Sequence, residues 1–105
     1  MAQKSRPLAP VTVSVAGTRV QITSSASGCG GIIFQANSAN TGKIYVGDST
    51  VTSSNGIAIG PGESYTIASQ SLDGVMDAEL ILSDYYLDAD TSGNSCRIQY
   101  LTVRS

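Results

Sequence analysis

Residues 42–67 have the sequence GKIYVGDSTVTSSNGIAIGPGESYTI, a series of short β-strand patterns separated by turns. Ile44 and Val46 share one parity, as expected for a strand with one buried face. Pro61 and Gly62 suit a tight turn, because proline presets φ and glycine accepts positive φ. Serine, threonine, asparagine and glycine hold the positions where most soluble domains carry lysine and glutamate. This surface chemistry favours packing against copies of the chain or against a larger surface.

The same alternation recurs on both sides of this stretch, and no segment sustains helical spacing. About eight short strands with frequent turns predict an all-β fold, an antiparallel β-sandwich or barrel. Apolar residues of matching parity mark strands near Val11–Val13–Val15, Ile57–Ile59, Tyr65–Ile67 and Ala78–Leu80–Leu82. The segment TSGNS at 91–95 predicts a hairpin loop. The predicted core consists of Val13, Val20, Ile22, Phe34, Ile44, Val46, Ile59, Ile67, Leu80, Leu82, Leu87 and Ile98.

The length of 105 residues predicts one domain. We expect residues 1–10 to form an extended N-terminal arm and residues 11–105 to form the β-domain. The two prolines of the arm remove amide donors, so the arm has little reason to fold on its own body. Its basic side chains could reach an acidic neighbour. The candidate partner-binding residues are Lys4, Arg6, Pro7, Leu8 and Pro10.

The charge pattern separates the two halves of the chain. Four basic residues and no acid lie in residues 1–43, whereas all eight acids and no base lie in residues 44–96. These charges either neutralise one another within a subunit or form complementary faces between subunits. The net charge of −2 gives no basic footprint for a nucleic acid. No apolar run is long enough to span a membrane. We therefore expect neither a nucleic acid nor a membrane as a partner.

The sequence favours no enzymatic chemistry and no cofactor. It contains no histidine, which excludes a histidine base or metal ligand. Asp88, Asp90 and Ser92, followed by Gly93, match the start of a calcium loop. The twelfth position is Gln99, which lacks the bidentate carboxylate of such loops. We therefore expect a polar turn that needs no metal, with a weak calcium site as the alternative.

The N-terminal sequence has no apolar segment typical of a secretory signal, which predicts synthesis in a cytoplasm. Cys29 and Cys96 are then reduced when made, although a later disulfide between them stays open. The five tyrosines could form a sugar-stacking platform, but core packing and subunit contacts also explain them.

Residues 44–67 and 82–103 resemble small virion structural proteins of tailed bacteriophages. The shared pattern consists of an IYVG strand, a Ser/Thr/Asn loop, NGI, PGE before the next strand, and YLDADTSGN before the last strand. The resemblance implies a non-enzymatic protein of the virion, made in a host cytoplasm. Its first implied role is a capsid decoration (cement) protein that binds and bridges major capsid subunits. A homo-oligomer is expected, and by analogy with icosahedral lattices a trimer.

Two alternatives to this role stay open. One is a tail, fibre or baseplate component with a receptor-binding surface. The other is a carbohydrate-binding or adhesin module.

Overall fold

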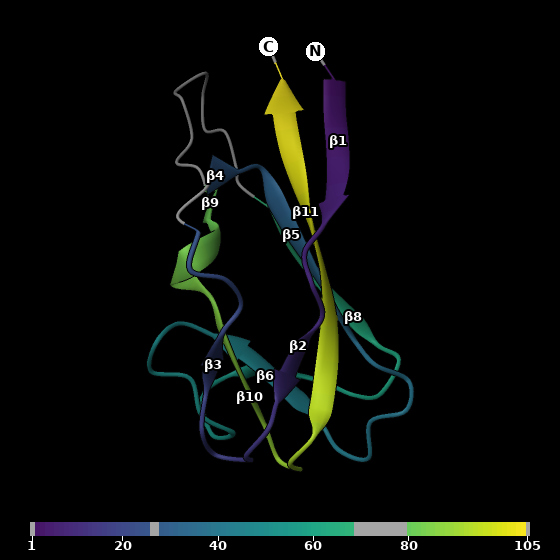
Figure 1. Cartoon of the computed structure of the whole chain (residues 1–105), viewed down its shortest axis with the longest axis vertical. Helices are drawn as coiled ribbons and strands as arrows, with labels where there is room; N and C mark the ends of the chain where they lie inside the picture. The colour runs from purple at the N-terminus through teal and green to yellow at the C-terminus, as the bar shows by residue number, and fades with distance from the viewer. Residues whose placement is uncertain (1, 26–27, 69–79, 105) are drawn as a thin grey trace.

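The alternating segments form short strands that assemble into two main antiparallel sheets and one small sheet (Figure 1). The computed structural model describes residues 2–25, 28–68 and 80–104. The first sheet contains β1 (Ala2–Pro7), β2 (Val11–Val13), β11 (Asn94–Arg104), β5 (Gly31–Ala36) and β8 (Ser64–Ala68). The second sheet contains β3 (Val20–Gln21), β10 (Tyr86–Ala89), β6 (Ile44–Gly47) and β7 (Ile57–Ile59). The small sheet pairs β4 (Gly28–Cys29) with β9 (Leu80–Ile81).

The predicted all-β fold is confirmed, and it is a sandwich-like arrangement of sheets. The helical content of the described residues is a single 3₁₀ turn, Leu82–Asp84. Leu82 thus belongs to this turn and not to the predicted strand, whereas Ala78 lies outside the described residues. Within the described part of the chain, no helix has the length and apolar character needed to cross a membrane.

Each of four chain segments contributes one strand to the first main sheet and one strand to the second. The neighbours run β2-β11-β5-β8 in the first sheet and β3-β10-β6-β7 in the second. The segments β2–β3, β10–β11, β5–β6 and β7–β8 therefore resemble one four-stranded sheet folded across its middle. Within each segment, the turn between its two strands leads from one sheet to the other, and we call such a turn an arch.

This topology corrects the predicted hairpin at 91–95, because β10 and β11 pair with other strands and not with each other. Leu87 and Ala89 face the core from the second sheet, and Cys96 and Ile98 face it from the first. A hairpin turn and an arch use the same glycine, serine and asparagine residues. The alternation of the flanking strands does not distinguish the two, because both place every second residue in the core.

The core lies between the two sheets and agrees closely with the predicted set. Nine of the twelve predicted residues are buried: Val13, Ile22, Phe34, Ile44, Val46, Ile59, Leu82, Leu87 and Ile98. The other three, Val20, Ile67 and Leu80, pack against the core while partly exposed. The ring of Phe34 lies 6.2 Å from that of Tyr85 in a tilted arrangement. Val15 is 57% exposed because β2 ends at Val13 and the chain turns into the first arch.

The first ten residues are extended, but the expectation that they do not fold on their own body is wrong. Strand β1 pairs antiparallel with β11, from Ala2 opposite Arg104 to Pro7 opposite Gln99. It forms one edge of the first sheet and projects with the end of β11 at one end of the molecule (Figure 1). The two strands bring the ends of the chain side by side.

The two prolines of this segment occupy positions where an edge strand tolerates them. Leu8 donates its N–H to the carbonyl of Ile98 at 2.9 Å, so the N–H position of Pro7 faces away from β11. Ala9 and Pro10 lie between the Leu8–Ile98 contact and the Val11–Cys96 pair, and together oppose one residue, Arg97. This is a β-bulge, one of the few places in a sheet that accept proline. The two prolines therefore mark an edge strand and not the predicted unpaired arm.

Candidate interaction surface

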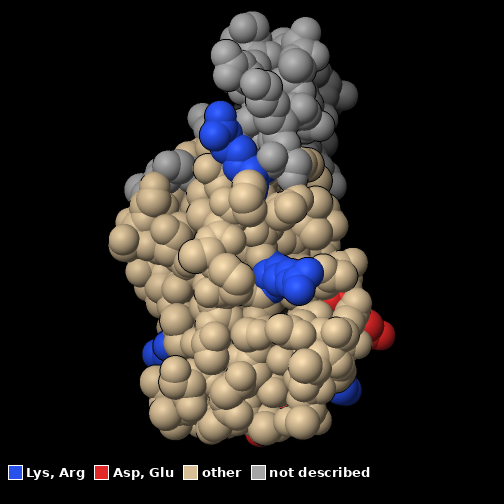
Figure 2. Space-filling view, turned by 45° about the vertical axis from the view of Figure 1, so that its right-hand side comes forward, with Lys and Arg blue, Asp and Glu red and all other residues tan. Residues whose placement is uncertain are grey.

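The described residues leave the outer face of the first sheet uncovered. Strands β5, β8 and β11 turn their alternate residues away from the core, because successive side chains in a strand point to opposite faces. These outward residues are Ile33, Gln35, Ser64, Thr66, Ala68, Arg97, Gln99 and Leu101. Arg97 carries the only charge in this set. Figure 2 brings this side forward and shows uncharged surface around isolated basic side chains, with acidic atoms at the margin.

Arg97 stands between two shallow hollows of this face. The larger has a volume of about 310 Å³ and is lined by Ile33, Gln35, Ser64, Arg97 and Gln99. The smaller, of about 150 Å³, shares Gln35 and Arg97 and extends toward the residues that follow β5. A guanidinium with amide and hydroxyl neighbours can donate several hydrogen bonds to carbonyl or carboxylate oxygens. The open shape fits a protein surface better than a small molecule.

The outer face of the second sheet is covered in part by residues 48–56. Val51 in this loop is 2% exposed. A Cβ atom placed at Gly47 or Gly56 would come within 2.9 or 2.7 Å of its methyl group, so both glycines allow the loop to lie against the strands. The same atom at Gly56 would lie 2.8 Å from Cβ of Tyr45. The two faces therefore differ: the second sheet has its own cover, and the described residues place none on the first.

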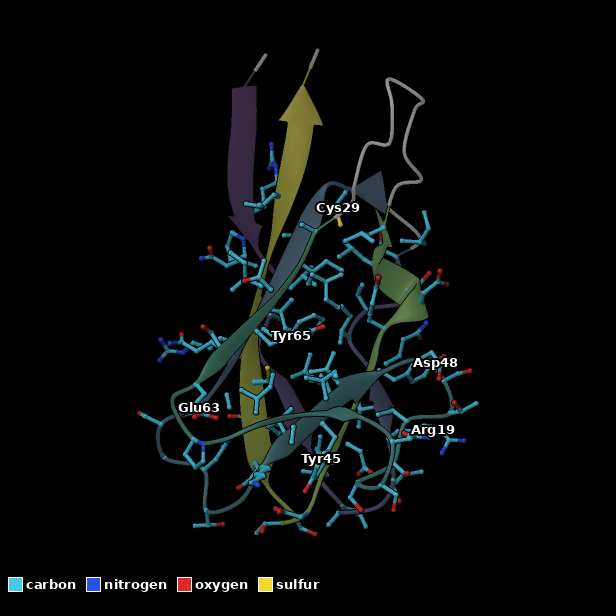
Figure 3. All side chains as sticks on the ribbon, turned by 180° about the vertical axis from the view of Figure 1, so that it is seen from behind. Arg19, Cys29, Tyr45, Asp48, Glu63 and Tyr65 are labelled. Carbon is cyan, nitrogen blue, oxygen red and sulfur yellow. The ribbon has the colours of Figure 1, made fainter. Side chains whose placement is uncertain are left out.

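Asp48 fixes the start of this covering loop. Its Oδ1 accepts hydrogen bonds from the N–H and the hydroxyl of Thr50, at 2.8 and 2.5 Å. The Thr50 side-chain hydrogen bond, with the smaller effect of the Arg19 charge, lowers the pKa of Asp48. Arg19 precedes β3 and Asp48 follows β6, and the two labelled side chains lie on the same side of the molecule (Figure 3).

Of the calcium candidates, Asp88 lies in β10, whereas Asp90 and Ser92 lie in the arch that follows it, and each accepts a hydrogen bond from a different distant backbone N–H. Asp88 is 2% exposed, and its Oδ1 accepts from the N–H of Gly17 at 3.0 Å. Asp90 Oδ1 accepts from the N–H of Lys43 at 2.9 Å. Ser92 Oγ accepts from the N–H of Ala16 at 2.9 Å. The described residues contain no group of three or more acidic or cysteine side chains placed to hold a metal ion.

These contacts join three of the arches into one polar layer, which we call the arch cluster: residues 14–19, 37–43 and 90–95. The amide of Asn40 binds Ser95 at both main-chain groups, donating to its carbonyl at 2.8 Å and accepting from its N–H at 2.9 Å. Asn94 Oδ1 accepts from the N–H of Thr41 at 3.3 Å, and Asn94 Nδ2 is buried without a partner among the described residues. Short polar side chains thus satisfy main-chain groups that the strands leave free at this end.

The phenol of Tyr45 lies at the edge of the arch cluster. Its hydroxyl donates to Oδ2 of Asp90 over 3.5 Å, and desolvation followed by the Asp90 charge raises its pKa. Three other tyrosines, Tyr65, Tyr85 and Tyr100, pack against the core. Figure 3 shows Tyr65 on the side of β8 that faces the second sheet. Core packing thus accounts for three of the five tyrosines.

The predicted partner-binding residues occupy one edge of the first sheet. Lys4, Arg6 and Pro7 belong to β1, and Arg6 and Pro7 are exposed. Leu8 packs against the core, and Pro10 is exposed in the bulge. A contact role for this segment stays a prediction. Sequence reasoning missed Arg97, Gln35 and Gln99, whose outward parity in β5 and β11 was the available signal.

Both cysteines are buried, and neither forms a disulfide. Burial raises the pKa of Cys96 to about 12, which keeps its thiol protonated at neutral pH.

No family model, no curated protein and no solved structure matches the chain.

Proposed function

We propose that the protein is a non-enzymatic structural component of a virus particle, and that it acts as a capsid decoration protein that binds and bridges major capsid subunits. The sequence resemblance of residues 44–67 and 82–103 motivates the choice of particle. Because virion proteins function as repeated copies, the proposal includes self-association. A tail or fibre position is the alternative, and the same observations support it.

The observation that carries the proposal is the outer face of the first sheet, which the described residues leave uncovered. Its outward residues on β5, β8 and β11 include one charge and several hydroxyl and amide groups. A wide face of this kind suits contact with another large surface, because hydrogen bonds and van der Waals contacts spread over many residues. The second sheet, covered in part by residues 48–56, offers less bare strand surface.

Arg97 gives this face its electrostatic preference. An exposed guanidinium at a contact steers an acidic partner and fixes its orientation more than it adds affinity. We therefore expect the docking surface on the capsid to be neutral or acidic where Arg97 meets it. The hollows on both sides of Arg97 can accept protruding side chains of the partner.

A binding experiment on particles tests the proposal. Particles from cells that make the protein are stripped of it, and purified protein is added back at increasing concentration. We expect saturable binding by the native chain and weaker binding by Arg97→Glu, with Arg19→Glu as a control of equal charge change at an exposed arginine that precedes β3 of the second sheet. No binding to the particle by the native chain would contradict the proposal.

A further inference from the structure

Strand β8 leaves one edge of the first sheet open among the described residues. Its pairing partner is β5, from Gly31 opposite Ala68 to Gln35 opposite Ser64. Ala36 donates its N–H to the carbonyl of Glu63 at 2.9 Å. Since residues of an antiparallel pair face their partner in alternation, Tyr65 and Ile67 direct their main-chain groups toward β5.

The remaining residues of β8 direct their main-chain groups outward. Ser64, Thr66 and Ala68 each present one N–H and one C=O to the open edge. Their side chains lie exposed on the outer face of the sheet. Tyr65 and Ile67, on the inner face, are only partly buried although they pack against the core. The edge therefore presents both free hydrogen-bonding groups and incompletely covered apolar surface.

The other edges of the sandwich have features that discourage pairing, whereas β8 has none. Strand β1 contains Lys4 and Pro7, and a bulge at Ala9–Pro10 interrupts its line. The second sheet ends in β3 and β7, which are two and three residues long. Strand β8, SYTIA, has five residues with no charge and no proline. Natural sheets protect exposed edges with charge, proline, bulges or shortness, so an unprotected edge indicates a pairing surface.

We propose that β8 pairs with β8 of a second copy of this chain, antiparallel and about a two-fold axis through Thr66. In this register Thr66 lies opposite Thr66 of the second copy, and Ser64 lies opposite its Ala68. All three outward residues then form hydrogen-bonded pairs. On the inner face Tyr65 meets Ile67 of the second copy, an aromatic and β-branched pair that favours strand association. The two first sheets become one continuous sheet.

The charges of the two copies permit this contact. Glu63 is the charged residue next to β8 in the described chain, and the two Glu63 residues lie at opposite ends of the paired segment. Six residues of strand separate them, roughly 20 Å, which exceeds the screening length at physiological salt. A five-residue contact is small, so we expect reversible dimers that form at high concentration. The pairing is two-fold, unlike the trimer expected by analogy, and it does not depend on a virus particle.

Sedimentation equilibrium of the purified chain tests the pairing. We expect the mass to rise with concentration from 10.8 kDa toward twice that value. Thr66→Lys places two ammonium groups opposite each other and should keep the mass at that of the monomer at every concentration. Thr12→Lys, at a threonine of β2 that is also exposed, should dimerise like the native chain. A native chain that stays monomeric, or that approaches three times the monomer mass, would overturn the proposal.

A cysteine at the two-fold axis provides a second measurement that does not require strong association. Paired residues in a hydrogen-bonded antiparallel position have Cα atoms about 5.5 Å apart, which a disulfide can span. Thr66→Cys should therefore oxidise in air to a covalent dimer about tenfold faster than Thr12→Cys. The native thiols are buried and should not compete in this reaction. Equal rates for the two variants would show that the thiols meet by random collision and would refute the β8 contact.

Discussion

Gly42 is the residue of the arch cluster whose replacement gives the sharpest test of that cluster. A Cβ atom at Gly42 would collide with Oδ1 of Asp90 and would lie 2.6 Å from Oγ1 of Thr91. The described glycines with positive φ are Gly17, Gly62 and Gly93, so alanine at position 42 has no backbone penalty of that kind. The cost of Gly42→Ala is therefore steric, and Asp90 must move to relieve it.

The magnitude follows from the contact that Asp90 must give up. Oδ1 of Asp90 accepts the N–H of Lys43 at 2.9 Å, and a hydrogen bond to a charged group contributes roughly 1.5–3 kcal/mol. The exposure of Asp90 reduces that value, and alanine regains about 0.4–1 kcal/mol by restricting the unfolded chain. We expect Gly42→Ala to lower the free energy of unfolding by about 1–2 kcal/mol.

A double-mutant cycle separates this collision from a general effect of alanine. In the Asp90→Ala background the blocking carboxylate is gone and Thr91 Oγ1, which otherwise contacts it at 3.2 Å, is free to rotate. There Gly42→Ala should change stability by less than about 0.5 kcal/mol. Gly93→Ala is the control: its φ of 88° makes alanine costly by about 1 kcal/mol in either background. Urea unfolding measures all variants. An equal loss from Gly42→Ala in both backgrounds would refute the reasoning.

Three further predictions follow from the same structure. Deleting residues 2–7 removes the strand paired along β11, so the melting temperature should fall by roughly 5–15 °C; an unchanged melting curve would restore the interpretation of an unpaired arm. Hydrogen bonds from Thr50 lower the pKa of Asp48 below its ordinary value of 3.8, so ionised Asp48 stabilises the fold above that value and loses its effect as pH falls through the folded pKa. The stability difference between the native chain and Asp48→Asn should therefore shrink from about pH 5 to pH 2 in urea titrations, and a pH-independent difference would contradict this. Cys96, whose pKa is about 12, should react with a thiol reagent at pH 8 at least about 100-fold more slowly in the folded protein than in denaturant; comparable rates would show an accessible thiolate.

The strands and core were predictable because alternation of apolar residues depends only on the two faces of a strand. Phe34 and Ile98 are buried in paired strands as the pattern predicted. The pairing of strands was less accessible. The segment 91–95 has the composition of a hairpin turn, yet it connects two sheets. The pairing of β10 and β11 with other strands shows this, and the contacts of Ser92 and Asn94 with distant arches agree with it. Composition therefore identifies a turn but not whether it joins two neighbouring strands or two sheets.

The uncharged character of the candidate surface could be predicted from composition, but its position in the fold could not. The composition predicts an uncharged surface, but the basic residues and prolines of the first ten positions favour Lys4, Arg6 and their neighbours as the binding segment. Prolines are common in unpaired segments, yet Pro7 and Pro10 also suit an edge strand with a bulge. Arg97 gained meaning only when β5 and β8 were placed beside β11, because a single arginine in a strand pattern has no recognisable partner.

Electron microscopy of particles from cells that make the protein tests the proposed function most directly. The proposal predicts density for this β-sandwich on the outer surface of the capsid, at regular positions between major capsid subunits, with the outer face of the first sheet against them. Density confined to the tail, or particles that lack the protein altogether, would contradict the assignment as a capsid decoration protein.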